Sequence, residues 1–68
     1  MADYVKKIKE LRKLNKLTQV ELSEMLGLSS STYGLYETYQ RQMDIYTFVM
    51  ICKILKVTPN ALLGFDEE

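Results

Sequence analysis

The sequence predicts an all-α fold, a compact five-helix bundle that forms one domain over residues 1–68. Three observations predict it. Apolar residues recur at helical spacing in five segments, helix-capping residues precede those segments, and no stretch alternates between apolar and polar residues for long enough to indicate a strand. A chain of 68 residues is also near the size at which one apolar core suffices without disulfides or metal.

The first helix is expected over residues 3–15, where Tyr4, Ile8 and Leu11 follow one another at intervals of four and three. Lysines occupy many of the other positions, so the polar face of this helix is strongly basic. Residues 1–16 carry six basic side chains and only two acidic ones.

The second and third helices are expected over residues 19–26 and 30–38. Thr18, followed by a glutamate three residues later, has the spacing of a capping box, and Gly27 suits the left-handed position that ends a helix. Ser29 is the expected N-cap of the third helix. Two short helices joined by so tight a turn form a helix-turn-helix arrangement, whose second helix projects from the body and fits a DNA major groove.

The fourth helix is expected over residues 45–56, after the N-cap Asp44. Four of its residues are expected to face inward: Ile45, Phe48, Cys52 and Leu55. A second apolar row consists of Tyr46, Met50 and Ile54. This row is covered either by an unusually wide core contact under the first or last helix or by a second copy of the chain, and we favour a homodimer interface.

The last helix is expected after Thr58, with Pro59 at its first position and Gly64 just past its end. The acidic tail, residues 65–68, is expected to be flexible. The chain contains no repeats and no low-complexity tract. Its elements are therefore expected to pack as one unit.

Composition excludes several functional classes. Apolar residues make up 47% and charged residues 26%, as in an ordinary globular chain. No apolar run approaches the roughly 18 residues needed to cross a membrane and no signal peptide is evident, so we expect a cytoplasmic protein. Cys52 is the only cysteine and histidine is absent, so we expect no disulfide, metal site, cofactor or enzymatic activity, and we expect Cys52 to act as a small buried apolar residue.

Several short motifs in this order resemble the phage-repressor-like (Cro/cI, Xre-like) helix-turn-helix family. The resemblance covers residues 8–64 without a gap. It is carried by residues 8–12 (IKELR), 17–19 (LTQ), 21–22 (EL), 26–29 (LGLS), Thr32, Glu37, 57–58 (VT) and 62–64 (LLG). It implies a sequence-specific DNA-binding transcription regulator that acts as a repressor and binds double-stranded DNA as a homodimer.

The resemblance also implies roles for individual residues. It implies that the DNA-binding residues are Gln19, Ser29, Ser30, Ser31, Thr32, Gly34, Leu35, Tyr39 and Arg41. Within this set, Gln19 would meet a phosphate or base, the third helix would face the groove, and Thr32 with the loop 39–41 would touch phosphates. Arg12 and Glu37 correspond to a structural salt bridge between the first and third helices. On the residues alone, the serines around position 30 also fit a solvated helix start.

The sequence departs from this family in its charge. Residues 17–40 contain three glutamates and no lysine or arginine, and Tyr39 stands where a glycine is familiar. The basic first helix, Arg41 and dimerisation are expected to offset the missing phosphate contacts. Leu35 suits either a thymine methyl group or a protein partner. The alternative function is therefore a protein-interaction module on the same fold, with weak or no DNA binding.

Overall fold

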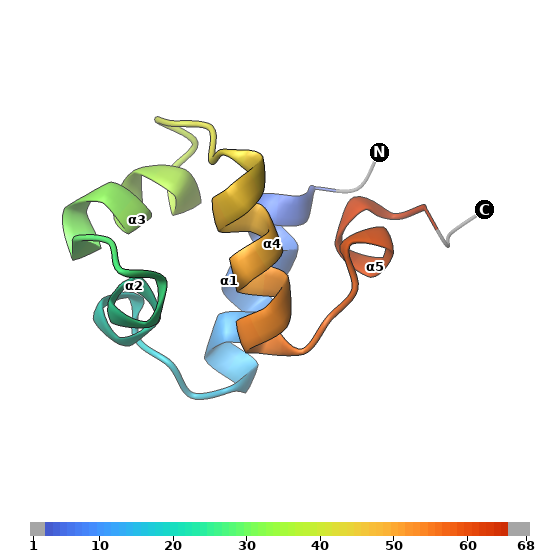
Figure 1. The fold of residues 1–68 in the computed structure, drawn as a ribbon, viewed down its shortest axis with the longest axis horizontal. Coiled ribbons are helices and arrows are strands. Elements are labelled where there is room, and N and C mark those ends of the chain that lie inside the picture. The colour runs from blue at the N-terminus through green and yellow to red at the C-terminus, as the bar shows by residue number, and fades with distance from the viewer. Residues whose placement is uncertain (1–2, 66–68) are drawn as a thin grey trace.

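The structure is a computed structural model of the chain, and it describes residues 3–65. This range contains five α-helices and no strand, which confirms the predicted all-α fold. The helices are α1 (Tyr4–Leu14), α2 (Gln19–Leu26), α3 (Ser30–Glu37), α4 (Ile45–Leu55) and α5 (Pro59–Leu63) (Figure 1). Of the acidic tail expected to be flexible, residues 66–68 lie outside the described residues. Phe65 is exposed.

The helices are arranged around a central pair. In Figure 1, α4 crosses in front of α1, while α2 and α3 lie on one side of α4 and α5 lies on the other. Each helix bound agrees with the expected one to within one residue, and the residues at these ends act as caps. Thr38 and Lys56, which were expected inside helices, are the C-caps of α3 and α4.

Local capping explains where the helices begin. Thr18 and Glu21 form a complete capping box, in which the Glu21 N–H donates to Thr18 Oγ1 (3.0 Å) and the Thr18 N–H donates to Glu21 Oε1 (2.8 Å). Asp44 accepts a hydrogen bond from the Thr47 N–H, and Thr58 caps α5 in the same way. Each cap satisfies a backbone donor that the first turn of a helix leaves without a partner.

The core is apolar and draws on all five helices. Its buried residues are Ile8, Leu22, Tyr33, Tyr36, Met43, Phe48, Ile51, Cys52, Leu55 and Leu62. The rings of Tyr4 and Phe48 add an edge-to-face contact, with centroids 5.6 Å apart, that joins α1 to α4. The thiol of Cys52 is buried, as expected. None of the helices within residues 3–65 has the length and apolar character needed to span a membrane.

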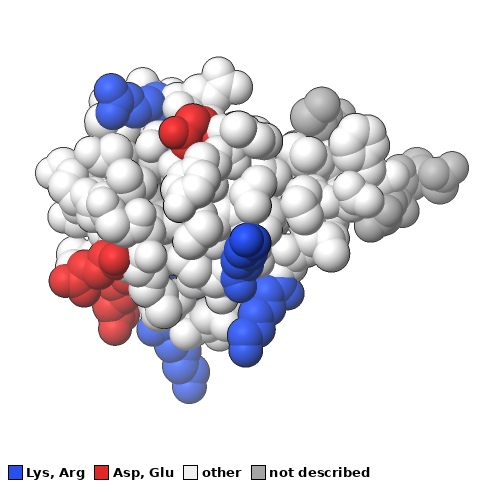
Figure 2. Space-filling model, in the orientation of Figure 1, with Lys and Arg blue, Asp and Glu red and all other residues white. Residues whose placement is uncertain are grey.

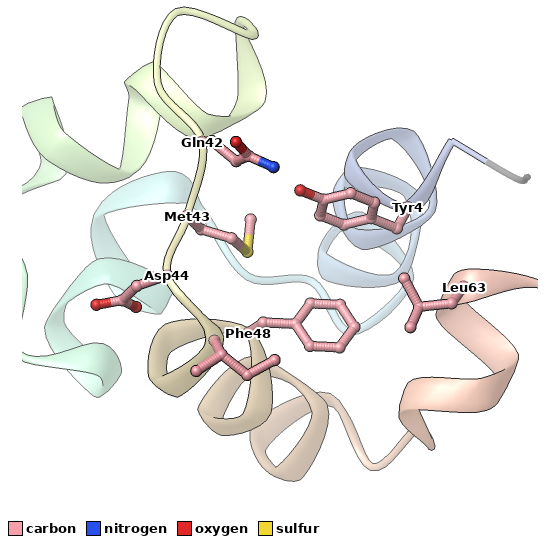
Figure 3. Close-up of a pocket in the computed structure, with 7 residues that line it drawn as sticks. Tyr4, Gln42, Met43, Asp44, Phe48 and Leu63 are labelled. Atoms are coloured by element: carbon pink, nitrogen blue, oxygen red, sulfur yellow. The ribbon is translucent and has the colours of Figure 1, made fainter.

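The expectation that Ile45 faces inward is wrong. Its side chain is 76% exposed, whereas Ile51, which was not among the residues expected to face inward, is fully buried in the core. Ile45 is the first residue of α4, where an open pocket replaces a packed neighbour. Figure 3 shows this pocket between Tyr4, Phe48 and Leu63. The helical spacing identified the correct face of α4, but it could not show that the first residue of this face has no packing partner to cover it.

The second apolar row of α4 does not form one uniform surface. Tyr46 is 70% exposed, whereas Met50 and Ile54 are half-buried and Ile54 packs against the core. Wide packing therefore covers the C-terminal part of the row. The exposed apolar residues of α4 are Ile45, Tyr46 and Val49.

Candidate nucleic-acid interface

The turn between α2 and α3 is set by Gly27. Its φ of +72° lies in the left-handed region, which glycine adopts without strain, and the Leu28 N–H donates to the Ser23 carbonyl (2.9 Å) to close the turn. A Cβ built on Gly27 would meet nothing within 4 Å. The backbone conformation, not lack of space, therefore favours glycine here.

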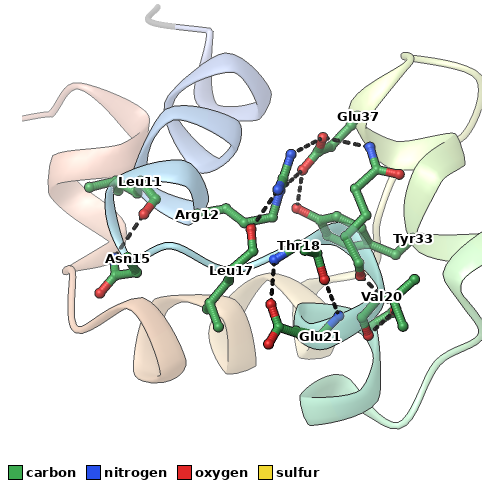
Figure 4. Close-up of polar contacts among 11 residues, drawn as sticks. Leu11, Arg12, Asn15, Leu17, Thr18, Val20, Glu21, Tyr33 and Glu37 are labelled. Carbon is green, nitrogen blue, oxygen red and sulfur yellow. Dashed lines mark hydrogen bonds and ion pairs between the residues drawn. The ribbon is translucent and has the colours of Figure 1, made fainter.

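The inner side of α3 is held by a buried polar network around Glu37 (Figure 4). Arg12 donates from Nε to Glu37 Oε2 (2.7 Å) and from Nη2 to Oε1 (3.1 Å), so the expected ion pair is present and bidentate. Tyr33 donates its hydroxyl to the same carboxylate (2.5 Å), and Gln19 donates its side-chain amide (2.9 Å). Arg12 Nη1 also donates to the Leu17 carbonyl (2.7 Å). The network joins α1, α2 and α3.

The charges in this network shift its acid–base equilibria. Burial alone would raise the pKa of Glu37, but hydrogen bonds from Arg12, Tyr33 and Gln19 outweigh burial and leave that pKa below its ordinary value. Burial raises the pKa of Tyr33, and donation to the Glu37 carboxylate raises it further. Glu37 is therefore ionised and Tyr33 is neutral near pH 7.

The outer side of α3 is neutral. Ser30 and Ser31 are exposed, and Thr32, Gly34 and Leu35 are partly exposed. These residues form one continuous surface on the first two turns of the helix, which we call the α3 outer face. A Cβ added at Gly34 would lie 3.6 Å from Gln19 Oε1, an ordinary contact, so an alanine would fit. The α3 outer face can offer hydroxyl groups and an apolar side chain, but no positive charge.

Three of the expected contact residues are already engaged within the fold. Ser29 Oγ accepts from the Thr32 N–H (3.1 Å) and donates to Thr32 Oγ1 (2.9 Å), so it acts as the N-cap of α3. The side-chain amide N–H of Gln19 donates to Glu37, and the side-chain carbonyl oxygen of Gln19 lies next to Gly34 of α3. The bonds of Ser29 with Thr32 belong to the cap that the sequence predicts, whereas the bond from Gln19 to Glu37 joins residues 18 positions apart and is not visible in any local pattern.

The loop after α3 has an unusual backbone at Tyr39. Its φ is +62°, the left-handed region that a glycine would occupy without strain, and this accounts for the glycine familiar at this position. The Tyr39 hydroxyl donates to Asp3 Oδ2 (2.6 Å), which lowers the pKa of Asp3 and raises the pKa of Tyr39. The loop is thereby attached to the N-cap of α1.

The same loop provides one basic group. The backbone N–H groups of Gln40 and Arg41 both donate to the Leu35 carbonyl (2.9 and 3.2 Å), so they complete the end of α3 instead of facing outward. The side chain of Arg41 is exposed. Arg41 is therefore the nearest basic residue in sequence after α3, and it is the group of this loop suited to a phosphate.

The surface over α2 is acidic. Figure 2 shows acidic atoms gathered on this part of the molecule, where Glu21 and Glu24 are exposed. The third glutamate of residues 17–40, Glu37, is paired with Arg12 and contributes no charge to the surface. Among residues 3–65, no group of three His, Cys, Asp or Glu side chains is placed to hold a metal ion.

Comparison with known proteins supports the arrangement just described. The family described as helix-turn-helix matches residues 8–62 of the chain. An uncharacterized HTH-type transcriptional regulator, YobD, of Bacillus subtilis (strain 168), is 29% identical over 65 residues, which are 96% of this chain and 58% of that protein. The chain thus spans less than two thirds of the length of this relative. No solved structure matches the chain.

Proposed function

The chain belongs to the helix-turn-helix family of the Cro/cI, Xre-like type, and on this premise we propose that it is a DNA-binding transcription regulator. The main support for the proposal is the position of the α3 outer face. It lies on the second helix of a helix-turn-helix, and the network around Glu37 fixes that helix from its inner side. A helix held in this way can enter a major groove as a rigid body.

Within the α3 outer face we assign base reading to Ser30, Ser31 and Leu35, with Gly34 allowing close approach of the groove. Serine hydroxyls donate or accept hydrogen bonds, and leucine can contact a thymine methyl group. Thr32, Tyr39 and Arg41 lie toward phosphates, while Gln19 and Ser29 contribute mainly by fixing α3. This division follows from their exposure and their hydrogen bonds within the fold.

The charge of the interface predicts weak binding by a single copy. Each phosphate neutralised by a basic group releases counterions, and residues 17–40 contain no such group. We therefore propose a homodimer on a two-fold symmetric operator, with Arg41 and the basic residues of α1 supplying attraction to phosphates. We further propose repression, because a domain that occupies its operator excludes other proteins from that DNA without any further contact.

The experiment is a titration of labelled duplex DNA with the chain. A duplex of random sequence measures general affinity at about 50 and 200 mM salt, and selection from a randomised duplex pool measures sequence preference. We expect affinity to fall with rising salt and the selection to enrich a palindromic sequence. Absence of binding at the lower salt concentration would contradict the proposal.

A protein-interaction module is the second candidate function. The observation that favours it is the apolar exposure of α2, where Val20 is 52% and Met25 is 55% exposed, beside the acidic residues Glu21 and Glu24. A surface of this kind suits a protein better than a phosphate backbone. The same titration separates the candidates, because this module would not bind DNA at low salt.

A further inference from the structure

One face of α4 is exposed along its length. The residues that form it are defined here as the α4 stripe: the N-cap Asp44 and the exposed helical residues Ile45, Tyr46, Val49 and Lys53. Ile45, Val49 and Lys53 follow one another at intervals of four residues, so they lie on one side of the helix. Ile45 and Tyr46 are 76% and 70% exposed, and Val49 is 36% exposed. Three apolar side chains in succession on one exposed helix face indicate a surface that a partner covers.

The two ends of the α4 stripe have opposite charge. Asp44 stands at the N-terminal end, where its carboxylate caps the helix and its pKa is lowered by hydrogen bonds from Thr47. Lys53 stands at the other end, one turn before the exposed Lys56. Figure 2 shows this polarity on the face over α4, with acidic atoms at one end, basic atoms at the other and uncharged surface between them.

We propose that the α4 stripe is the interface of a homodimer, in which α4 of one copy packs antiparallel against α4 of a second copy. This arrangement places the Asp44 of each copy beside the Lys53 of the other and brings the apolar residues into contact. A parallel arrangement would oppose like charges. Under this pairing, Val49 lies next to the two-fold axis and faces its own counterpart, as an isologous interface requires. The antiparallel helix dipoles add a small favourable contribution.

The proposal deepens the homodimer of the proposed function and rests on it for its role in DNA binding. Because α2 and α3 lie on one side of α4 (Figure 1), a two-fold axis that crosses α4 toward that side leaves the two copies of α3 on the same side of the dimer. Both can then face one DNA duplex. The pocket beside Ile45, lined by Tyr4, Met43 and Phe48, adds apolar area at the N-terminal end of the α4 stripe.

The first test is the oligomeric state of the whole chain without DNA, measured by sedimentation equilibrium. Ile45→Glu puts a carboxylate into the apolar contact, and we expect it to raise the dimer dissociation constant at least about tenfold. The matched control is Leu14→Glu, since Leu14 is 77% exposed on α1 and outside the stripe. A monomeric wild type, or equal dissociation constants for the two variants, would overturn the proposal.

The second test examines the charge pairing. Lys53→Glu brings two carboxylates together across the interface, and we expect it to weaken the dimer. Adding Asp44→Asn removes one of those charges but retains a good N-cap, so the double variant should recover part of the affinity. Lack of weakening in Lys53→Glu, or lack of recovery in the double variant, would contradict the antiparallel arrangement.

The third test locates the axis. With a short bis-maleimide reagent, Val49→Cys should form a covalent dimer at least about tenfold faster than Leu14→Cys, because a bound partner raises the effective concentration of the second thiol. Wild type gives the background, since Cys52 is buried. Equal rates would overturn the assignment. These readouts contain no DNA, so their failure is distinct from a failure of the DNA titration, which tests the proposed function.

Discussion

The two sides of α3 use their polar groups in opposite ways. On the inner side, Glu37 and Tyr33 are buried, and their side-chain hydrogen bonds lie within the network that also contains Arg12 and Gln19. On the outer side, Ser30 and Ser31 are exposed and uncharged. The charged group of α3 therefore faces inward, where it fixes the position of the helix, and only neutral groups face a partner. Substitutions on the inner side should therefore change stability, and those on the outer side should change recognition.

The largest expected effect comes from breaking the inner network at Arg12. Arg12→Ala leaves the Glu37 carboxylate buried without its main partner, and we expect it to lower the free energy of unfolding by about 3–5 kcal/mol. Urea denaturation measures this loss. The double variant Arg12→Met with Glu37→Leu is the control, because it removes both charges and should be more stable than Arg12→Ala alone. A single variant within about 1 kcal/mol of wild type would show that the ion pair is solvated.

The pH dependence of stability tests the same network. The folded-state pKa of Glu37 is lowered from its ordinary value of 4.5, so its contribution is fully present above that pH and is lost as the pH falls through the folded-state pKa. Acidification below about pH 4.5 should therefore destabilise wild type more steeply than Glu37→Gln. Thermal unfolding from pH 7 to pH 2 provides the comparison. Parallel curves for the two proteins would assign the acid sensitivity to other carboxylates.

Replacing a glycine should have opposite effects on stability in the turn, at Gly27, and on the α3 outer face, at Gly34. Gly27→Ala forces a left-handed backbone on alanine and should cost about 1 kcal/mol of stability. Gly34→Ala adds a side chain inside a helix, where the Cβ makes an ordinary contact, and should stabilise by about 0.5–1 kcal/mol. Chemical denaturation of both variants measures this difference. Equal effects of the two changes would contradict the backbone conformation at the turn.

The helix boundaries could be predicted from the sequence because caps are local. Thr18, Ser29, Asp44 and Thr58 each accept a bond from a backbone N–H three residues later, and such spacing is visible in the chain. The hydrogen bond from Tyr39 to Asp3 joins residues that are 36 positions apart, so no local sequence pattern predicts it. The exposure of Ile45 and the engagement of Gln19 depend likewise on how helices pack, so helical spacing alone could not reveal them.

The smallest expected effect on stability comes from the outer side of α3. Ser31→Ala should leave the free energy of unfolding within about 0.5 kcal/mol of wild type but change the sequence enriched from a randomised duplex pool. Lys6→Ala, on the exposed side of α1, should weaken binding to all sequences alike and reduce the salt dependence. Equilibrium binding to a panel of duplexes compares them. Identical profiles for the two variants would leave Ser31 without a role in base reading.

The most direct test of the central claim is an NMR titration of the amide resonances of the chain with the duplex enriched by selection. The claim that α3 reads DNA with its outer side predicts that the largest shifts fall on Ser30, Ser31 and Leu35 and on the loop at Arg41. The buried network at Tyr33 and Glu37 should retain its hydrogen bonds. Shifts confined to α2 around Val20 and Met25, with none on α3, would contradict the claim.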